Sequence, residues 1–228
     1  MTLSVADEPR LADFGDAVRI IQGESACIGL ILFGSEARGD ASSDSDLDVL
    51  LVYRGDPPLG LLDIFPDRAS VAFYDWRRLA SISQQSPLFA LHLALEGTVL
   101  HDPTRRLREF GPPGLLDRAA IEKVRASTLG RYSELLEQPS SAVRAGPELY
   151  ALAKQAAMLH AAAHGRPEFN RHRAFARLVA YDRRLGPAVR FVETLEAAWL
   201  DARARTGAIH AIDYPKAVFE TQRILDAR

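Results

Sequence analysis

Hydrophobic and polar positions alternate along the first half of the chain in a way that predicts a small sheet with helices. Helices are expected where apolar residues recur at helical spacing, over about residues 6–22, 77–84 and 87–96. Three apolar runs of the length of buried strands are Cys27–Phe33, Leu47–Tyr53 and Ala69–Tyr74. A brief apolar stretch near residues 98–100 follows the last of these helices.

The second half of the chain carries only helical patterns. The segment Phe110–Gly114 contains two prolines between glycines, which cannot continue a helix or a central strand, and it predicts a domain boundary. Beyond it we expect helices near residues 116–138, 147–164, 171–185, 187–206 and 213–227. Their apolar stripes favour packing in a bundle. The pattern therefore predicts an α/β domain over residues 1–110, with a small mixed sheet, followed by an all-α helical bundle over residues 115–228.

Composition adds little until the charge is divided between the two halves. The chain has 228 residues, of which 47% are hydrophobic and 25% charged, as in ordinary globular proteins. No apolar run approaches the roughly 18 residues of a membrane span, and no secretion signal is visible, so a cytoplasmic protein is expected. The single cysteine, Cys27, is interpreted as a small core residue. Residues 1–110 carry a net charge of −7 and residues 111–228 a net charge of +5, although the total is −2.

Candidate chemistry gathers between the first two predicted strands. Gly34 and Ser35 follow the first strand, and a glycine there lets the backbone approach an anion while the serine hydroxyl and nearby amides donate hydrogen bonds to phosphate oxygens. Asp46 and Asp48 open the second strand two residues apart, so both carboxylates leave the same face. Two carboxylates so close repel unless a cation lies between them, and Mg²⁺ suits such oxygen ligands together with substrate phosphates. The pattern indicates metal-assisted phosphoryl or nucleotidyl transfer.

At this point the sequence resembles a known family. Gly34-Ser35, ten intervening residues and Asp46-Leu47-Asp48, with Ala37-Arg38-Gly39 between them, match the minimal nucleotidyltransferase signature of the DNA polymerase β-like superfamily. The resemblance implies two Mg²⁺ ions and a nucleoside triphosphate, ATP above all, whose α-phosphate is attacked by an acceptor hydroxyl with release of pyrophosphate. It also implies that Asp46 and Asp48 are catalytic metal ligands and that Gly34 and Ser35 hold the β- and γ-phosphates.

One expected feature of that family is missing from its usual place. Members usually supply a third carboxylate from the next strand, where this chain has Ser70 or Ala72. Asp75 is the nearest carboxylate and is a candidate for the catalytic base, but a regular strand points it the other way, and it is also suited to be the N-cap of the following helix. Arg38 either contacts a phosphate or forms a salt bridge with Glu36, Asp40 or Asp44.

The basic half offers a surface for the acceptor. Arg173 and Arg177 share one face of a predicted helix, and this stripe is either the solvated side of an amphipathic helix or a contact for triphosphate or a polyanion such as tRNA. The arrangement resembles the helical domains of aminoglycoside nucleotidyltransferases and the HEPN-like domains that accompany minimal nucleotidyltransferases. The acceptor stays open among a small molecule, a protein and tRNA.

Two hypotheses follow from the sequence. In the first, the protein is a Mg²⁺-dependent nucleotidyltransferase that transfers a nucleoside monophosphate, AMP in particular, to a hydroxyl group. In the second, it is a degenerate nucleotide-binding or antitoxin-like interaction protein that keeps the fold without turnover. Both predict binding of Mg-ATP, and they differ in whether the labelled α-phosphate becomes attached to an acceptor.

Overall fold

The computed structural model describes residues 12–227 except 42–44, 56–59, 109–114, 138–141, 205–207 and 209. The chain forms two compact units, Met1–Gly114 and Leu115–Arg228. The predicted boundary segment Phe110–Gly114 lies outside the described residues, as do residues 6–11 of the first predicted helix. None of the described helices combines the length and the hydropathy that crossing a membrane requires.

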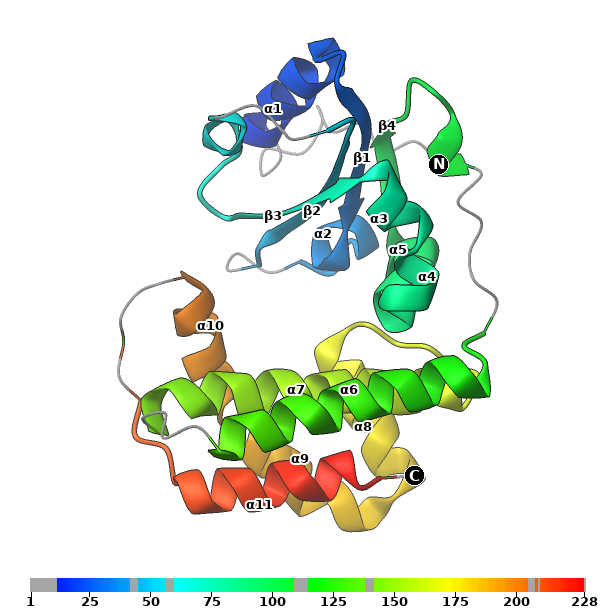
Figure 1. The fold of residues 1–228 in the computed structure, drawn as a ribbon. Coiled ribbons are helices and arrows are strands. Elements are labelled where there is room, and N and C mark those ends of the chain that lie inside the picture. The colour runs from blue at the N-terminus through cyan, green and yellow to red at the C-terminus, as the bar shows by residue number, and fades with distance from the viewer. Residues whose placement is uncertain are drawn as a thin grey trace. The chain divides into compact units, whose positions relative to one another are not determined.

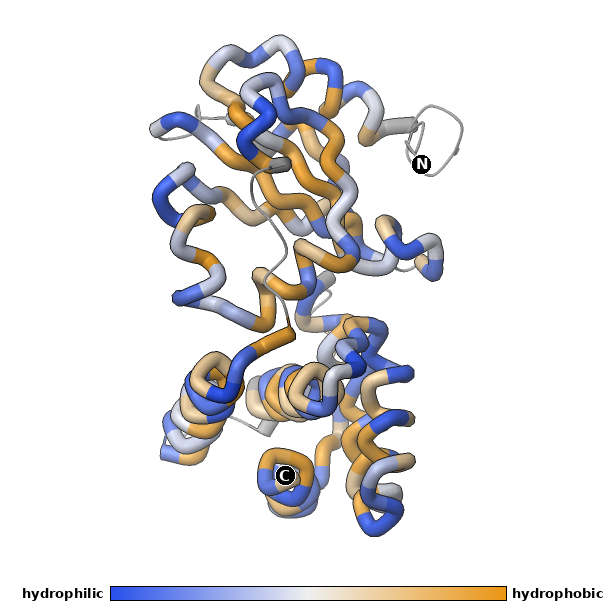
Figure 2. Tube along the Cα trace, turned by 90° about the vertical axis from the view of Figure 1, so that its right-hand side faces the viewer, coloured by the Kyte–Doolittle hydropathy of each residue, from blue (hydrophilic) through white to orange (hydrophobic). Residues whose placement is uncertain are grey.

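The N-terminal unit is built on a four-stranded mixed sheet (Figure 1). Its strands are β1 (Cys27–Phe33), β2 (Leu47–Tyr53), β3 (Ala69–Asp75) and β4 (Thr98–His101). The order is β3-β2-β1-β4; β1 is antiparallel to both β2 and β4, whereas β2 and β3 run parallel. The three apolar runs identified in the sequence are the three longer strands, and the tube in Figure 2 is correspondingly hydrophobic along them.

Helices cover both faces of this sheet. Phe14 and Ile21 of α1 (Ala12–Gly23) pack with Val49 and Leu51 on one face. Leu79 and Leu93, from two of the helices that follow β3, pack with the residues of the other face. Those helices are α3 (Trp76–Ala80), α4 (Ile82–Gln85) and α5 (Pro87–Glu96), and single turns of 3-10 helix occupy Leu61–Ile64 and Arg106–Arg108. Alternate residues of each strand therefore enter two separate cores.

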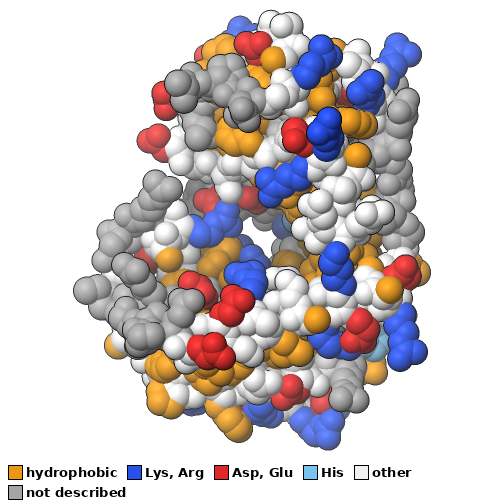
Figure 3. Space-filling model, in the orientation of Figure 1, with side chains coloured by type: hydrophobic (Ala, Val, Ile, Leu, Met, Phe, Trp, Pro, Cys, Tyr) orange, Lys and Arg blue, Asp and Glu red, His pale blue; other side chains and the backbone are white. Residues whose placement is uncertain are grey.

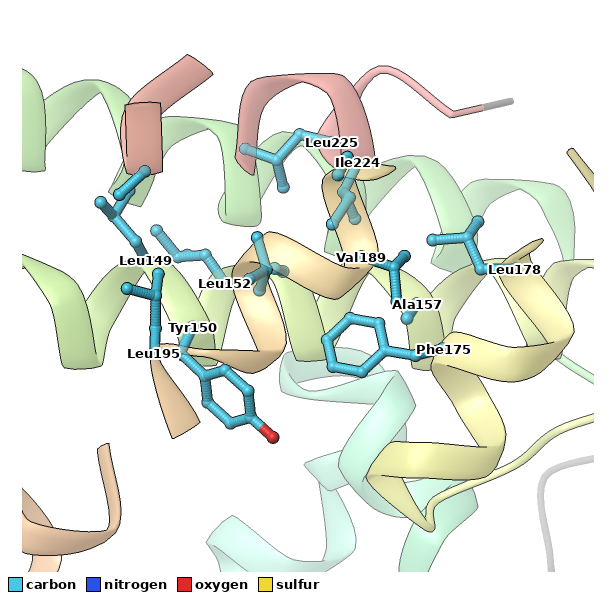
Figure 4. Packing of buried hydrophobic residues seen from close by; sticks show 14 of the residues in the cluster. Leu149, Tyr150, Leu152, Ala157, Phe175, Leu178, Val189, Leu195, Ile224 and Leu225 are labelled. Atoms are coloured by element: carbon cyan, nitrogen blue, oxygen red, sulfur yellow. The ribbon is translucent and has the colours of Figure 1, made fainter. Parts of the chain in front are cut away.

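In the second unit, all the regular secondary structure of the described residues is helical. Its helices are α6 (Arg118–Glu137), α7 (Ala142–Ala163), α8 (Arg171–Tyr181), α9 (Gly186–Glu193), α10 (Glu196–Ala204) and α11 (Tyr214–Leu225), with a 3-10 turn at Arg183–Leu185. Tyr150 and Leu152 of α7 lie at the centre of the core, beside Phe175 of α8 and Ile224 of α11 (Figure 4). The predicted fold class, a small mixed α/β sheet followed by a helical bundle, is confirmed.

Four predicted helices have clearly different bounds in the structure. The helix expected over 171–185 ends at Tyr181 and is followed by the separate 3-10 turn Arg183–Leu185. The segment expected over 77–84 is interrupted at Ser81, whose hydroxyl donates to the carbonyl of Arg77. The segment expected over 187–206 is interrupted near Thr194, whose hydroxyl bonds to the carbonyl of Phe191. Helix α7 begins at Ala142 rather than at 147, because Pro147 lies in its second turn and removes only one backbone hydrogen bond there. Short polar side chains that bond to the preceding turn account for both interruptions.

Candidate functional site

Gly34 and Asp48 lie in direct contact at one end of the sheet. The antiparallel register pairs Phe33, the last residue of β1, with Asp48 of β2, so the residue after Phe33 lies beside the Asp48 side chain. A Cβ atom placed on Gly34 would lie 2.5 Å from Oδ2 of Asp48, and Gly34 has φ +76°. Both observations require glycine, since an L side chain would clash with the carboxylate and rarely adopts this conformation. The turn and the carboxylate, predicted to act together, are therefore adjacent.

Asp46 precedes β2 by one residue and Asp48 is its second residue. Both side chains are half-buried, whereas Leu47 between them is fully buried in the core under α1. This alternation places Asp46 and Asp48 on the side of β2 away from that core, as the spacing predicts. Among the described residues, no group of three or more His, Cys, Asp and Glu side chains is arranged to hold a metal ion. Any ion here would need ligands beyond these two carboxylates.

Ser35 is the second residue of a short helix. Helix α2 (Gly34–Arg38) follows β1 without a loop and ends at Gly39, which has φ 75°. The buried carboxylate of Glu36 in this helix accepts a hydrogen bond of 2.8 Å from Arg68, a residue just before β3. The carbonyl of Arg68 in turn accepts from the amide of Leu47. Arg68 thus ties the turn at Gly34 and Ser35 to the beginning of β2.

Arg38 is held by two carboxylates. Its Nε donates to Asp40 at 3.1 Å, which is one of the salt bridges predicted from the sequence. Its Nη1 donates to Glu96 of α5 at 2.6 Å. Burial alone would lower the pKa of the Arg38 guanidinium, but the hydrogen bonds to Asp40 and Glu96 outweigh burial and raise that pKa above its ordinary value. Glu36 is not its partner, and Asp44 lies outside the described residues. Arg38 joins α2 to α5 and so holds the Gly34 turn in place.

His92 takes part in the same cluster. Its Nε2 lies 2.8 Å from Oε2 of Glu96, one helical turn later on α5, and its ring packs edge-on against Phe33 at 5.5 Å between centroids. Glu96 therefore links His92 and Arg38. Neither Glu96 nor Arg68 was singled out from the sequence. The spacing of four residues between His92 and Glu96 was the available signal for the first, and no spacing signals an ion pair between residues as distant as Glu36 and Arg68.

Strand β3 brings no carboxylate to the side of the sheet that carries Asp48. In the parallel register Asp48 pairs with Ser70 and Leu50 pairs with Ala72, so these residues share one face. Tyr74 is the next residue on that face, opposite Val52. The sequence-based expectation that Ser70 or Ala72 occupies the place of a third carboxylate agrees with this register.

Asp75 does not lie near Asp46 and Asp48. The prediction that it is a candidate for the catalytic base is therefore wrong. It pairs with Tyr53, which lies five residues along β2 from Asp48, and this corresponds to a separation of about 16 Å on the opposite face of the sheet. The Asp75 carboxylate accepts a 2.6 Å hydrogen bond from the amide of Arg78 and is the N-cap of α3. The alternative interpretation of Asp75, as a helix cap, is confirmed.

The cap predicts a stability difference between two variants. Asp75→Ala should lower the free energy of unfolding by about 1 kcal/mol, because the amide of Arg78 loses its acceptor, whereas Asp75→Asn should leave it nearly unchanged because asparagine caps helices equally well. Urea denaturation measures both. Equal losses in the two variants would show that the negative charge, and not the cap, is what α3 needs.

Arg173 and Arg177 lie on the exposed side of α8, whose Phe175 and Leu178 are buried. Arg177 is engaged within its own unit: Nη1 donates to the carbonyl of Arg166 at 2.6 Å, and Nη2 lies 3.3 Å from Glu168. On the face of this unit shown in Figure 3, basic, acidic and hydrophobic side chains are interspersed. The structure thus gives Arg177 a local role, and a role of Arg173 and Arg177 toward a polyanion stays a prediction.

Cys27 is a core residue, as its position in an apolar run indicates. Its side chain is 1% exposed at the start of β1, and burial raises the pKa of the thiol to about 11. A thiol in this state is a poor nucleophile at neutral pH. Cys27 therefore contributes packing and no chemistry to the site.

Comparison with known proteins identifies the family of the chain. The nucleotidyltransferase domain family model matches residues 19–138, which include the whole sheet and α6. No curated protein is similar enough to be matched. A crystal structure of a toxin-antitoxin with AMP-PNP is 16% identical, with a TM-score of 0.32, over 53% of this chain and 91% of that chain. The family match covers more than half of the 228 residues, and the chain belongs to the nucleotidyltransferase domain family.

Proposed function

We propose that the protein transfers a nucleoside monophosphate, AMP from ATP, to a hydroxyl group of an acceptor and releases pyrophosphate. Membership of the nucleotidyltransferase family supports nucleotidyl transfer in general. The contact between Gly34 and Asp48 carries the proposal, because a side chain at residue 34 would collide with the Asp48 carboxylate. The acceptor belongs to one of three classes: a small molecule, a protein or tRNA.

The two aspartates suit Mg²⁺. This ion binds through one or two carboxylates and completes its coordination with water and substrate phosphates, so a pair of carboxylates without further protein ligands fits it. Asp46 and Asp48 lie on one side of β2 and are accessible from outside the core. When bound, Mg²⁺ would neutralise charge on the triphosphate.

The other residues of the site bind and orient the triphosphate. Gly34 lets the turn lie directly against the Asp48 carboxylate, and the backbone amides of this turn and the Ser35 hydroxyl are hydrogen-bond donors to phosphate oxygens. Glu36 with Arg68, and Arg38 with Glu96, fix this turn through ion pairs to the beginning of β3 and to α5. A turn held from two sides loses little conformational entropy on binding, which favours transfer by positioning.

A second candidate function is favoured by one observation. The residues of β3 beside Asp48 and Leu50 are Ser70 and Ala72, so no carboxylate there is placed to accept the proton of an acceptor hydroxyl. A protein of this kind binds nucleotide and acts through interaction, as an antitoxin-like partner would. Nucleotide binding without transfer is its expected behaviour.

Transfer of label from the α-phosphate tests the proposal. Each α-³²P nucleoside triphosphate is incubated with the protein, Mg²⁺ and one acceptor class at a time: aminoglycosides, tRNA or lysate proteins. We expect label on one class, strongest with ATP, and none when EDTA removes the metal, because no metal ion then lies between the negative triphosphate and the carboxylates of Asp46 and Asp48. Stoichiometric pyrophosphate release identifies nucleotidyl transfer. Saturable binding of ATP with no label on any acceptor class would support the second function instead.

A further inference from the structure

The N-terminal unit has a concave surface at the opposite end of its sheet from Asp48. Its volume is about 670 Å³, within the range of small-molecule sites. It is formed where β2 ends, where α3 begins and where the chain leaves β4. Its walls include Tyr53, Arg54, Trp76, Arg77, Thr104 and Arg106, with Asp75 at the edge. Because Asp75 pairs with Tyr53, five residues along β2 from Asp48, this surface is separate from the proposed transfer site.

Three arginines line this surface. Arg54, Arg77 and Arg106 are exposed, and within the described part of the chain no carboxylate forms an ion pair with any of them. Asp75 is the acidic residue of the wall, and its carboxylate already accepts the amide of Arg78. The wall therefore keeps a net positive charge. Guanidinium groups present paired donors that match the oxygens of a phosphate.

An aromatic ring lies among the arginines. Trp76 is half-buried, and the guanidinium carbon of Arg106 lies 5.5 Å from the centre of its ring. Because Arg106 already lies over this ring, a nucleobase that stacks on the indole displaces its guanidinium, which then faces the phosphate. Thr104 adds a hydroxyl that both donates and accepts hydrogen bonds. The wall thus combines the groups that recognise a base and a phosphate at the same time.

We propose that this surface binds a nucleoside monophosphate unit, either as a free nucleotide or as the phosphorylated end of an RNA strand. Trp76 stacks on the base, and Arg77 and Arg106 hold the phosphate. The proposal does not depend on the transfer reaction, since neither Asp46, Asp48 nor the Gly34 turn contributes to this surface.

The test uses the full chain with Asp46→Asn/Asp48→Asn in EDTA, so that the metal-dependent site does not contribute. Equilibrium dialysis with labelled AMP should show saturable binding. Arg77→Ala/Arg106→Ala should weaken it by at least about tenfold, because each charge-assisted hydrogen bond to phosphate is lost. The matched control is Arg131→Ala, which removes an exposed arginine from α6 and should leave the affinity unchanged.

Two further measurements test whether the base stacks on Trp76 and whether the ligand is a free nucleotide or the end of an RNA strand. AMP should bind more tightly than ribose 5-phosphate, and Trp76→Leu should abolish this preference because the stacking surface is gone. Competition by a 5′-phosphorylated RNA hexamer assigns the surface to an RNA end, and absence of competition assigns it to the free nucleotide. The proposal is overturned if AMP does not bind, or if Arg77→Ala/Arg106→Ala binds AMP as tightly as Arg131→Ala does.

Discussion

Asp46→Asn/Asp48→Asn should reduce the transfer of α-phosphate label by at least about a thousandfold, since removal of even one group that stabilises transition-state charge costs 10²–10³ in rate. Both carboxylates lie on the side of β2 that carries no core packing from α1, so asparagine keeps their shape and the fold. The loss should appear in the rate of transfer. The melting temperature in EDTA should change little, because asparagine keeps the size of each side chain and one of its acceptor oxygens at these half-buried positions.

The matched control for this variant is Asp67→Asn. Asp67 is an exposed aspartate in the turn before β3, so the substitution removes a negative charge from the same unit without touching the Gly34 turn. Its transfer rate should equal that of the unchanged protein. If the double variant still transfers label at a comparable rate, the aspartates are not the metal ligands and the proposed function loses its site.

The elements that were predictable from sequence are those with a strong local pattern. The three longer strands follow apolar runs bounded by turns, and α5 begins at Pro87 and ends at Glu96 as expected. The interruptions at Ser81 and Thr194 were missed because they arise from hydroxyl groups that bond to the preceding turn, and the same residues also occur within unbroken helices. The spacing of hydrophobic residues continues through both positions, so it gives no sign that a helix is interrupted there.

The sequence names the candidate residues of the site but not the contacts between them. The spacing of Gly34 and Asp48 indicated a common site. The contact that leaves no room for a Cβ atom on Gly34 depends on the register that pairs Phe33 with Asp48, which the spacing alone does not determine. Arg38 was weighed as a phosphate ligand or an ion-pair partner, and its contact with Glu96 comes from the packing of α2 near α5. The ion pair of Arg38 with Glu96 is thus a result of tertiary packing, which the sequence pattern does not specify.

Ser70→Asp should raise the rate of label transfer by at least about tenfold, part of the 10²–10⁴ that a well-placed general base contributes. Ser70 is exposed and lies directly beside Asp48 in the parallel register, so a carboxylate at residue 70 would lie on the face of the sheet that carries Asp48. There it would accept the proton of the acceptor hydroxyl, which the side chains of β3 on this face cannot do.

The same substitution has a measurable effect on stability that shows where the new carboxylate lies. Adjacent strands are about 4.8 Å apart, so a charge at residue 70 should repel that of Asp48 and lower the melting temperature in EDTA. Mg²⁺ should then raise the melting temperature more than it does in the unchanged protein, because binding to the folded state offsets this repulsion. Ser70→Asn, which has the same shape without the charge, should show neither effect. If Ser70→Asp shows the Mg²⁺-dependent stabilisation but no gain in rate, the missing carboxylate does not limit transfer, and the base is supplied by another group.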